Sequence, residues 1–305
     1  MKAVVTGGAG FIGSRLVDAL IGHGAEVHVL DNLSTGNRGR LHAQAVLHQA
    51  DIRDPEAKAI LAGIQPDTLF HLAAQADVQR SIQEPGCDAG INIAGTVNML
   101  DACRESGVRK FIFASTSAVY GKLERMPLAV TDPVQPISYY GLSKLTAEHY
   151  IRLYHAFYGL NYTILRYGNV YGPGQTAKGE GGVIAIFMER LKNNLTLPIN
   201  GDGEQTRDFV YVDDVAAANI AAVKLGDRGT YHVSTGSRTS INHVVRELQR
   251  IRGEAVTVQY RDAKEGDIRD SCLDNRLTTA ELAWQPAVPL EEGLLLTYKS
   301  WQQQT

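Results

Sequence analysis

The stretch VVTGGAGFIG, residues 4–13, begins as a β-rich run and continues into a predicted helix. It places Gly7, Gly10 and Gly13 three residues apart at this junction. Glycine there allows a tight turn and a close approach of the backbone to a pyrophosphate, and the helix N-terminus offers free N–H groups to the anion. The stretch therefore predicts a dinucleotide-binding turn. On spacing alone, a connecting turn without a ligand remains the alternative.

The first 170 residues alternate short β-rich runs with helix-length segments. The predicted strands span 2–7, 26–32, 45–52, 68–74, 110–116 and 161–168, and the predicted helices span 12–23, 55–62, 88–106 and 141–158. This alternation is typical of repeated βαβ units around a parallel sheet. We therefore expect an α/β fold with a Rossmann-type, doubly wound parallel sheet.

The composition changes after Gly172, where a glycine-rich connection is followed by more mixed elements. Further helices are predicted at 183–194 and 213–225, and the run 230–236 is predicted to be another core strand. The chain is therefore expected to return to the first sheet before it leaves again. We predict a first domain of residues 1–168 plus about 208–236, and a smaller mixed α/β C-terminal domain for the substrate of about 169–207 plus 237–305.

An acidic residue ends the second predicted strand, since Asp31 lies 18 residues beyond Gly13. A carboxylate at this place accepts hydrogen bonds from an adenosine ribose and repels a 2′-phosphate. The pattern predicts NAD rather than NADP, although Arg38 and Arg40 nearby leave the second cofactor as an alternative. Asp51, at the end of the third strand, is either an adenine contact or a solvated loop carboxylate.

The segment SYYGLSK, residues 138–144, places Lys144 four residues after Tyr140, so the two side chains share one helix face. The helix that carries them follows a strand ending in the hydroxyl run STS, residues 115–117. A phenol is a poor base at neutral pH, but a neighbouring ammonium group and a positive nicotinamide ring favour the phenolate. We predict that Tyr140 is catalytic rather than a half-buried helix aromatic, and that Lys144 modulates it.

The overall composition argues against several other classes of protein. A formal net charge of −3 with interspersed signs gives no broad basic surface, which argues against nucleic acid as a partner. The chain has no apolar run long enough for a membrane span and no export signal. The three cysteines have neither metal-site spacing nor an even count. We therefore expect a cytoplasmic protein without a metal that acts on a small molecule.

Several ordered blocks of the chain resemble one family. They are TGGAGFIGSRLVDAL, VLDNLSTG, FASTSAVYG, YYGLSK, LRYGNVYGPGQ and GDGEQTRDFVYVDDV. Together they resemble the extended short-chain dehydrogenase/reductases, in particular the nucleotide-sugar epimerases typified by UDP-glucose 4-epimerase. The resemblance spans nearly the entire chain, and it implies an NAD-dependent isomerase that inverts C4 of a UDP-hexose through a transient 4-keto sugar.

The resemblance also implies roles for individual residues. The expected cofactor contacts are Gly7, Gly10, Phe11, Ile12, Gly13, Asp31, Asn32, Asp51, Ile52, Leu72, Ala73, Ala74, Gln75, Ser115, Tyr140 and Lys144. Thr116 falls where the family has its catalytic serine or threonine, beside the base Tyr140 and its partner Lys144. The expected contacts to the sugar nucleotide are Thr116, Tyr140, Asn169, Val183, Leu197, Ile199, Arg207, Lys264, Arg269 and Ser271.

Departures from the family pattern bear on the reaction. Ser117 and Ala118 follow Thr116, where related dehydratases and decarboxylases carry a carboxylate, so chemistry beyond C4 oxidation and reduction is disfavoured. Lys264 stands where relatives have a second diphosphate-binding arginine, and Arg269 is the alternative for that contact. The small Ser271 at the expected gating position predicts that 2-acetamido sugars are accepted as well as glucose and galactose.

Three alternatives remain from the sequence. Arg80 in a loop near the expected substrate leaves a UDP-uronic acid as a possible substrate. A non-catalytic NAD-binding regulator and a one-way sugar oxidoreductase are the others, and the retained Tyr140 and Lys144 argue against the regulator. By analogy with the family, helices 88–106 and 141–158 are expected to pair in a homodimer.

Overall fold

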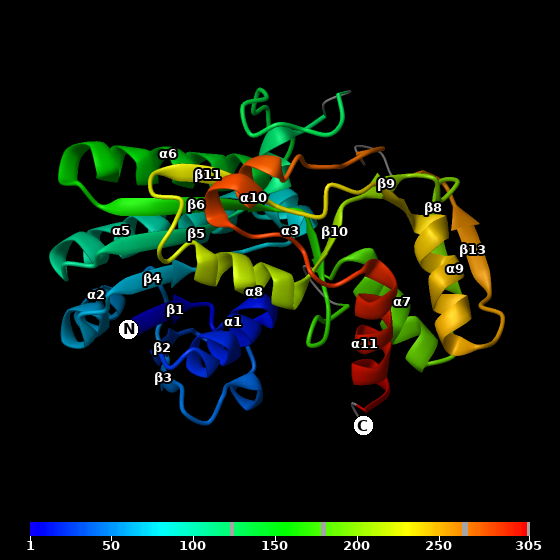
Figure 1. Cartoon of the computed structure of the whole chain (residues 1–305), viewed down its shortest axis with the longest axis horizontal. Helices are drawn as coiled ribbons and strands as arrows, with labels where there is room; N and C mark the ends of the chain where they lie inside the picture. Colours follow the sequence, from blue (N-terminus) through cyan, green and yellow to red (C-terminus); the bar gives the residue numbers. More distant parts are fainter. Residues whose placement is uncertain (123–124, 178–180, 264–267, 304–305) are drawn as a thin grey trace.

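A computed structural model of the chain describes residues 1–122, 125–177, 181–263 and 268–303. Its centre is one parallel sheet with the strand order β11-β6-β5-β4-β1-β2-β3 (Figure 1). The seven strands are β1 (Lys2–Thr6), β2 (Glu26–Leu30), β3 (Val46–His48), β4 (Thr68–His71), β5 (Lys110–Thr116), β6 (Asn161–Tyr167) and β11 (Gly229–Val233). The order reverses at β1, which pairs with β2 on one side and with β4 on the other. The doubly wound sheet predicted from the sequence is confirmed.

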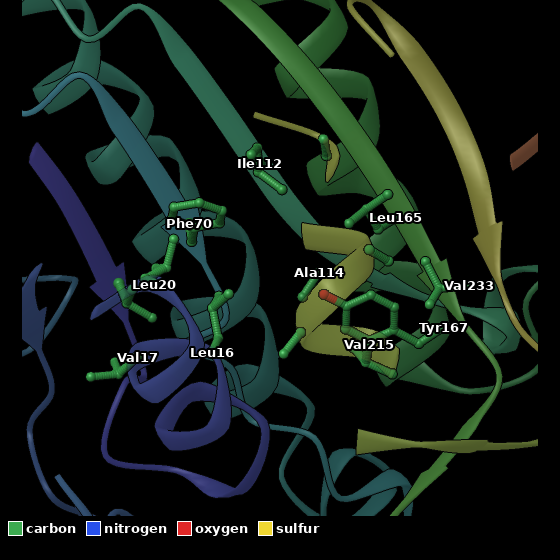
Figure 2. Close-up of a cluster of buried hydrophobic side chains, with 14 of the residues drawn as sticks. Leu16, Val17, Leu20, Phe70, Ile112, Ala114, Leu165, Tyr167, Val215 and Val233 are labelled. Atoms are coloured by element: carbon green, nitrogen blue, oxygen red, sulfur yellow. The ribbon is translucent and has the colours of Figure 1, made fainter. Parts of the chain in front are cut away.

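Helices cover both faces of the sheet because its strands are apolar on both sides. Along β5, Ile112 and Ala114 enter one core, while Phe111 and Phe113 enter the other. The first core is covered by α1 (Phe11–Gly22) and α8 (Val212–Ala221), and the second by α2 (Pro55–Ile64), α5 (Thr96–Glu105) and α6 (Tyr139–Tyr158). Figure 2 shows side chains of α1 and Val215 of α8 packed on the first face.

The segment predicted as one helix at 88–106 is interrupted. It consists of α4 (Pro85–Ala89), the π-helical η2 (Gly90–Gly95) and α5. Within η2, Asn92 turns into the interior, where its Oδ1 accepts a hydrogen bond from Gln75 N at 2.9 Å. At Gly95 an added Cβ would lie 2.6 Å from Ile52 Cδ1, so glycine lets the helix approach the end of the third strand. A widened turn with an inward polar residue is frequent at functional sites.

Helix α6 is the longest described helix, with 20 residues. Ser138 caps its N-terminus by accepting a hydrogen bond from Gly141 N at 3.1 Å, and Gly159 ends it in the left-handed conformation. In the part of the chain that the structure describes, no helix combines the length and the apolar character needed to cross a bilayer. Lys144 Nζ donates to Ala114 O at 2.8 Å, which places the N-terminal part of α6 beside the carboxyl end of β5.

A second lobe has its own core beyond β6. Its elements are β7 (Asn169–Tyr171), α7 (Val183–Lys192), β8 (Leu197–Asn200), β9 (Thr206–Arg207), β10 (Phe209–Tyr211), β12 (Thr239–Ser240), α9 (Ile241–Arg252), β13 (Val258–Arg261) and α11 (Leu290–Gln303). Helices α7, α9 and α11 share this core with the small sheets (Figure 1). Between β13 and α11 the chain returns to the first lobe, where Leu282 of α10 (Arg276–Leu282) and Trp284 pack in the first core. The lobes are therefore more interleaved than the predicted boundary at residue 237.

Replacing Leu16 with alanine tests the contribution of the first core. Leu16 is fully buried between α1 and the sheet, so the substitution should lower the free energy of unfolding by about 3 kcal/mol. Leu296→Ala is the matched control, because that side chain on α11 is 39% exposed and should cost roughly 0.5 kcal/mol or less. Urea unfolding followed by circular dichroism measures both. Equal losses in the two variants would contradict this packing.

Candidate functional site

A cavity runs along the carboxyl edge of the parallel sheet. It is lined by residues from the ends of β1, β2, β4, β5 and β6, from the loops that follow them, and from the first turns of α1 and α6. The lining residues are Gly7, Gly10, Phe11, Ile12, Gly13, Leu30, Asp31, Asn32, Ser34, Thr35, Ala50, Asp51, Ile52, Leu72, Ala73, Ala74, Ala76, Ile91, Ala114, Ser115, Thr116, Tyr140, Lys144, Tyr167, Gly168 and Val170. Every predicted cofactor contact except Gln75 therefore borders the same space.

The glycine turn after β1 forms one part of the wall. Gly7 has φ +70°, and a Cβ there would lie 2.7 Å from Ala73 N. A Cβ on Gly13 would lie 2.1 Å from Gly7 O, so these two positions exclude a side chain. The first backbone hydrogen bond within α1 is donated by Ser14 to Gly10 O at 3.1 Å. Ala9 N and Gly10 N already donate within the turn, so the N–H groups that can face an anion are those of Phe11, Ile12 and Gly13 in the first turn of α1.

Asp31 is held in place by the turn that it faces. Its Oδ2 accepts a hydrogen bond from Ala9 N at 2.9 Å, and its Oδ1 accepts one from Leu33 N at 2.8 Å. Only 8% of the residue is exposed. A carboxylate fixed at this depth suits ribose hydroxyl groups, which donate hydrogen bonds, and disfavours a phosphate.

Asp51 forms the far end of the cavity together with Asn32. Arg53 donates to both carboxylate oxygens at 2.8 Å, and Asn32 Nδ2 donates to Oδ2 at 2.8 Å. The hydrogen bonds from Arg53 hold the pKa of Asp51 well below its usual value, despite partial burial. Asp51 is therefore ionised at the edge of the cavity. Arg53 N also donates to its Oδ1 at 2.9 Å, so its four acceptor positions are used within the chain.

Behind the cavity floor, a chain of hydrogen bonds supports the end of β4. Ala73 N donates to Thr6 Oγ1 at 3.2 Å, and His71 contacts Thr6 Oγ1 at 2.8 Å and Thr96 Oγ1 at 3.0 Å. Burial, with a smaller effect from the charge of Lys144, lowers the pKa of His71 to about 3, so the ring is neutral. Gln75 belongs to this layer rather than to the cavity wall, since its side chain bonds to Asp88 Oδ1 at 3.0 Å.

The structure brings Tyr140, Lys144 and Thr116 to the same end of the cavity. Tyr140 and Lys144 lie in the first turns of α6, and Thr116 is the last residue of β5. Lys144 is 3% exposed, donates to Ala114 O at 2.8 Å, and has its Nζ 4.7 Å from the ring centre of Phe113. Thr116 Oγ1 accepts a hydrogen bond from Ala118 N at 3.1 Å. A phenol, an ammonium group and a hydroxyl thus face one space.

The predicted contacts to the sugar nucleotide beyond β6 lie in the second lobe, outside the lining of this cavity. Asn169 begins β7 and Val183 begins α7. Leu197 and Ile199 are 0% and 1% exposed, with their side chains in the second core. Because these two side chains are enclosed by protein, any ligand contact at β8 has to come from its backbone, from Pro198 or from Asn200.

Arg207 and Ser271 come together through Thr206. Thr206 N donates to Arg269 O at 2.9 Å, and Ser271 N donates to Thr206 O at 3.2 Å, so the segment after residue 268 runs beside β9. The Arg269 side chain points elsewhere and binds both carboxylate oxygens of Asp202 at 2.7 and 2.9 Å. Its hydrogen bonds lower the pKa of Asp202 to about 2. Lys264, the other predicted candidate, lies outside the described residues.

Tyr167 and Gly168 line the cavity but were not predicted from the sequence. Tyr167 pairs with Thr116 in the parallel register of β5 and β6, and its hydroxyl accepts a hydrogen bond from Asn219 Nδ2 at 2.8 Å. Figure 2 shows its ring beside Ala114 and Val215. The available signal was its position at the carboxyl end of a strand next to the one that carries Thr116.

A parallel sheet with a glycine turn, a ribose-facing carboxylate and a Tyr/Lys pair defines a dinucleotide-dependent enzyme that acts on an alcohol or a ketone. Comparison with known proteins gives the same class. Residues 3–234 match the model of the NAD dependent epimerase/dehydratase family. The chain belongs to this family.

Three solved structures are especially similar to the chain. The UDP-glucose 4-epimerase of Thermotoga maritima, solved with UDP-glucose, is 43% identical with a TM-score of 0.97, and the match covers 99% of each chain. The UDP-glucose 4-epimerase of Thermus thermophilus, solved with NAD, is 40% identical with a TM-score of 0.95 over 100% of each chain. The UDP-N-acetylglucosamine 4-epimerase of Methanobrevibacter ruminantium is 36% identical with a TM-score of 0.95, over 100% of this chain and 99% of that one.

NAD is the cofactor of this family, and the cavity fits it. Because Gly7 and Gly13 have no side chains, a pyrophosphate can approach the backbone beside the N-terminus of α1. Asp31 offers a fixed carboxylate for an adenosine ribose, and Asp51 borders the same end of the cavity. The cavity continues from the glycine turn to Tyr140, so the nicotinamide end of a bound NAD would lie beside that residue.

Gly13→Ala should weaken NAD binding by roughly tenfold or more, equivalent to about 1.4 kcal/mol. The reason is that the added Cβ would lie 2.1 Å from Gly7 O, so the turn has to move away from the pyrophosphate position. Gly22→Ala is the control on the same helix, because its Cβ would meet no atom within 4 Å. Calorimetric titration of the cofactor-free proteins with NAD measures the affinities. Equal affinities of the two variants would refute the assignment.

Proposed function

We propose that the protein inverts the configuration at C4 of a UDP-hexose, interconverting UDP-glucose and UDP-galactose. The main support is one observation, that Tyr140, Lys144 and Thr116 share a cavity with the glycine turn and Asp31. The solved relatives described above include UDP-glucose 4-epimerases that are at least 40% identical over nearly their whole length. An isomerase of this kind needs a bound dinucleotide and an acid–base residue near one sugar hydroxyl, and the cavity combines a dinucleotide-type turn with Tyr140.

In the proposed mechanism, Tyr140 takes the proton from the 4-hydroxyl group of the sugar. The charge of Lys144 favours the phenolate of Tyr140, and Thr116 forms a hydrogen bond to the same sugar oxygen. Bound NAD supplies the acceptor, and later the donor, of the hydride at C4. Tyr140 then returns the proton after the flat 4-keto sugar has turned over in the site.

The residues after Thr116 support a reaction limited to C4. The short helix η3 (Ser117–Tyr120) begins there with Ser117 and Ala118, neither of which has an acid or base group for carbons 5 or 6. Elimination or decarboxylation needs such a group in the site. We therefore prefer epimerisation to dehydration.

We further propose that the second lobe binds the UDP group. Arg207 offers a planar, charged fork that suits a diphosphate, and Ser271 lies beside it across Thr206. Asn169 and Val183 would add contacts at the edges. Arg269 is a weaker candidate for the diphosphate, since both of its terminal nitrogens are engaged by Asp202.

A uronic acid substrate has less support. Arg80, the residue that would bind a C6 carboxylate, donates from its Nε to Glu84 at 3.2 Å, and 48% of its side chain is exposed. An exposed arginine that already has a carboxylate partner gives no reason to prefer a uronic acid over a neutral hexose.

We also propose a homodimer formed by α5 and α6. Along α6, the side chains of Leu142, Tyr150, Leu153 and Phe157 form an exposed apolar stripe. Other apolar residues of these two helices, namely Leu100, Leu145 and Ile151, are buried within the chain. The proposal therefore rests on the exposed stripe alone.

Tyr140→Phe should lower kcat by at least about 100-fold, because the variant has no group to take the sugar proton. NAD should remain bound, since the glycine turn and Asp31 are unchanged. Tyr139→Phe is the control, because that neighbouring ring is 49% exposed, and it should keep near wild-type turnover. Chromatography of UDP-galactose formed from UDP-glucose gives kcat, and the NAD content of the purified proteins gives occupancy. A fully active Tyr140→Phe variant would refute the mechanism.

The wild-type protein should also interconvert UDP-N-acetylglucosamine and UDP-N-acetylgalactosamine, because the residue at the expected gating position is the small Ser271. Ser271→Tyr should lower kcat/KM for the acetamido substrates by roughly tenfold or more. Turnover of UDP-glucose by the same variant is the internal control and should be retained. Coupled assays with the four sugar nucleotides measure both activities. If wild type leaves UDP-N-acetylglucosamine unchanged, the proposed role of Ser271 is wrong.

A further inference from the structure

A fully buried carboxylate, Glu148, lies one helical turn beyond Lys144 on α6. Its Oε1 accepts hydrogen bonds from Ser115 Oγ at 2.6 Å and from Arg166 Nε at 2.9 Å. Its Oε2 accepts from Arg166 Nη2 at 2.7 Å and from Arg152 Nη2 at 3.0 Å. The four acceptor positions of the carboxylate are thus used, and α6 is tied to both β5 and β6.

These contacts determine which residue carries the hydrogen of the bond between Glu148 and Ser115. Burial by itself raises the pKa of a carboxyl group, but the hydrogen bonds and charge of Arg166, with smaller effects from Ser115 and Arg152, hold the pKa of Glu148 below its usual value. Glu148 is therefore ionised and can only accept. The hydrogen belongs to Ser115, whose hydroxyl donates toward α6.

The donor and acceptor roles in the hydrogen bonds on the other side of Arg166 are also determined. Arg166 Nη1 donates to Tyr120 Oη at 2.7 Å, so the hydrogen of Tyr120 goes to His232 Nε2 at 2.6 Å. His232 then carries its hydrogen on Nδ1 and donates it to Asp274 O at 2.9 Å. Burial lowers the pKa of His232 to about 4, which keeps this ring neutral. Arg166 is therefore held toward Glu148 by partners on both sides.

Ser115 borders the cavity between Ala114, which accepts from Lys144, and Thr116. Because its hydrogen is used by Glu148, its oxygen has only lone pairs for a ligand in the cavity. The complementary group on the ligand is an N–H or O–H donor. At the end of NAD away from Asp31 and Asp51, the nicotinamide carboxamide carries an N–H donor of this kind.

We propose that Glu148 is a positioning residue, which makes Ser115 a hydrogen-bond acceptor for the nicotinamide carboxamide and thereby sets the orientation of the reactive ring. This inference rests on the proposed function, with the nicotinamide beside Tyr140. Inversion at C4 requires the same ring face before and after the sugar turns over. A ring with a free carboxamide would rotate away and would let reduced cofactor and 4-keto sugar escape.

The ion pair between Glu148 and Arg166 also has a structural role, which has to be distinguished from the positioning role. Glu148 and Arg166 also hold α6 on the sheet, and loss of either partner leaves a buried charge without compensation. A purely structural effect does not depend on the Ser115 hydroxyl. A positioning effect acts through that hydroxyl and disappears once it has been removed. A double-mutant cycle between residues 115 and 148 therefore distinguishes the two.

The experiment uses the full chain with Glu148→Gln, with Ser115→Ala and with both substitutions. Each protein is loaded with NADH, and the fluorescence emission of the bound cofactor reports the environment of its ring. With UDP-glucose as substrate, kcat, KM and free NADH released during turnover are also measured. The matched control is Arg152→Met, which removes a partner of Glu148 Oε2 whose side chain is 34% exposed and leaves Ser115 untouched.

Each single variant should shift the emission of bound NADH, release free NADH and lower kcat by about 10- to 100-fold, with KM for the sugar nucleotide unchanged. The double variant should be no worse than either single variant, and Arg152→Met should match wild type. Multiplying losses in the double variant, or wild-type emission and kcat for Ser115→Ala, would overturn the proposal.

Misfolding of Glu148→Gln and failure of the proposed function can each be distinguished from failure of this inference. Ser115→Ala keeps the ion pair intact, so it tests the proposal even if thermal melting shows that Glu148→Gln does not fold. If wild type fails to interconvert UDP-sugars, the proposed function is wrong. The emission of bound NADH in Ser115→Ala and its matched control still supports or refutes the acceptor role of Ser115 in that case.

Discussion

The seven strands of the central sheet run parallel, and their common direction brings the groups of the cavity together. Every strand that continues into a helix through a βαβ crossover ends at the same edge of the sheet. The glycine turn, Asp31, Ala73, Thr116 and Tyr167 therefore all reach one cavity, although 160 residues of chain separate the first from the last. The reversal of strand order at β1 opens the crevice in which a dinucleotide lies in folds of this kind.

Helix α6 carries the proposed acid–base residues, and polar contacts help to hold its active end. Burying an ammonium group such as Lys144 is costly unless it is compensated, and Ala114 O and the ring of Phe113 supply that compensation. One turn later, Glu148 ties the helix to β5 and β6 through Ser115 and Arg166. Geometry that depends on several hydrogen bonds of defined direction is rigid, which suits a reaction in which small displacements are costly.

Much of the fold followed from local patterns. The predicted strands agree with the observed ones within a few residues, and the parallel Rossmann-type sheet is confirmed. The glycine spacing and Asp31 predicted NAD as the cofactor. This prediction is confirmed, since the family to which the chain belongs is NAD-dependent. The prediction of one helix at 88–106 was wrong in detail, since a π-helical turn interrupts it where Asn92 bonds to Gln75. That turn depends on a partner distant in the sequence, which helix propensity does not report.

The alternation of strands and helices and the glycine turn could be predicted from the amino-acid sequence, because they depend on side-chain period and on backbone conformations that a few adjacent residues control. Tertiary structure alone decided which polar groups meet. It enclosed Leu197 and Ile199 in the second core, paired Arg269 with Asp202, returned Trp284 to the first core and brought Glu148 to Ser115. The physical reason is that a hydrogen bond or an ion pair requires two groups within about 3 Å, and only the packed order of the strands places residues so far apart in the chain at that distance.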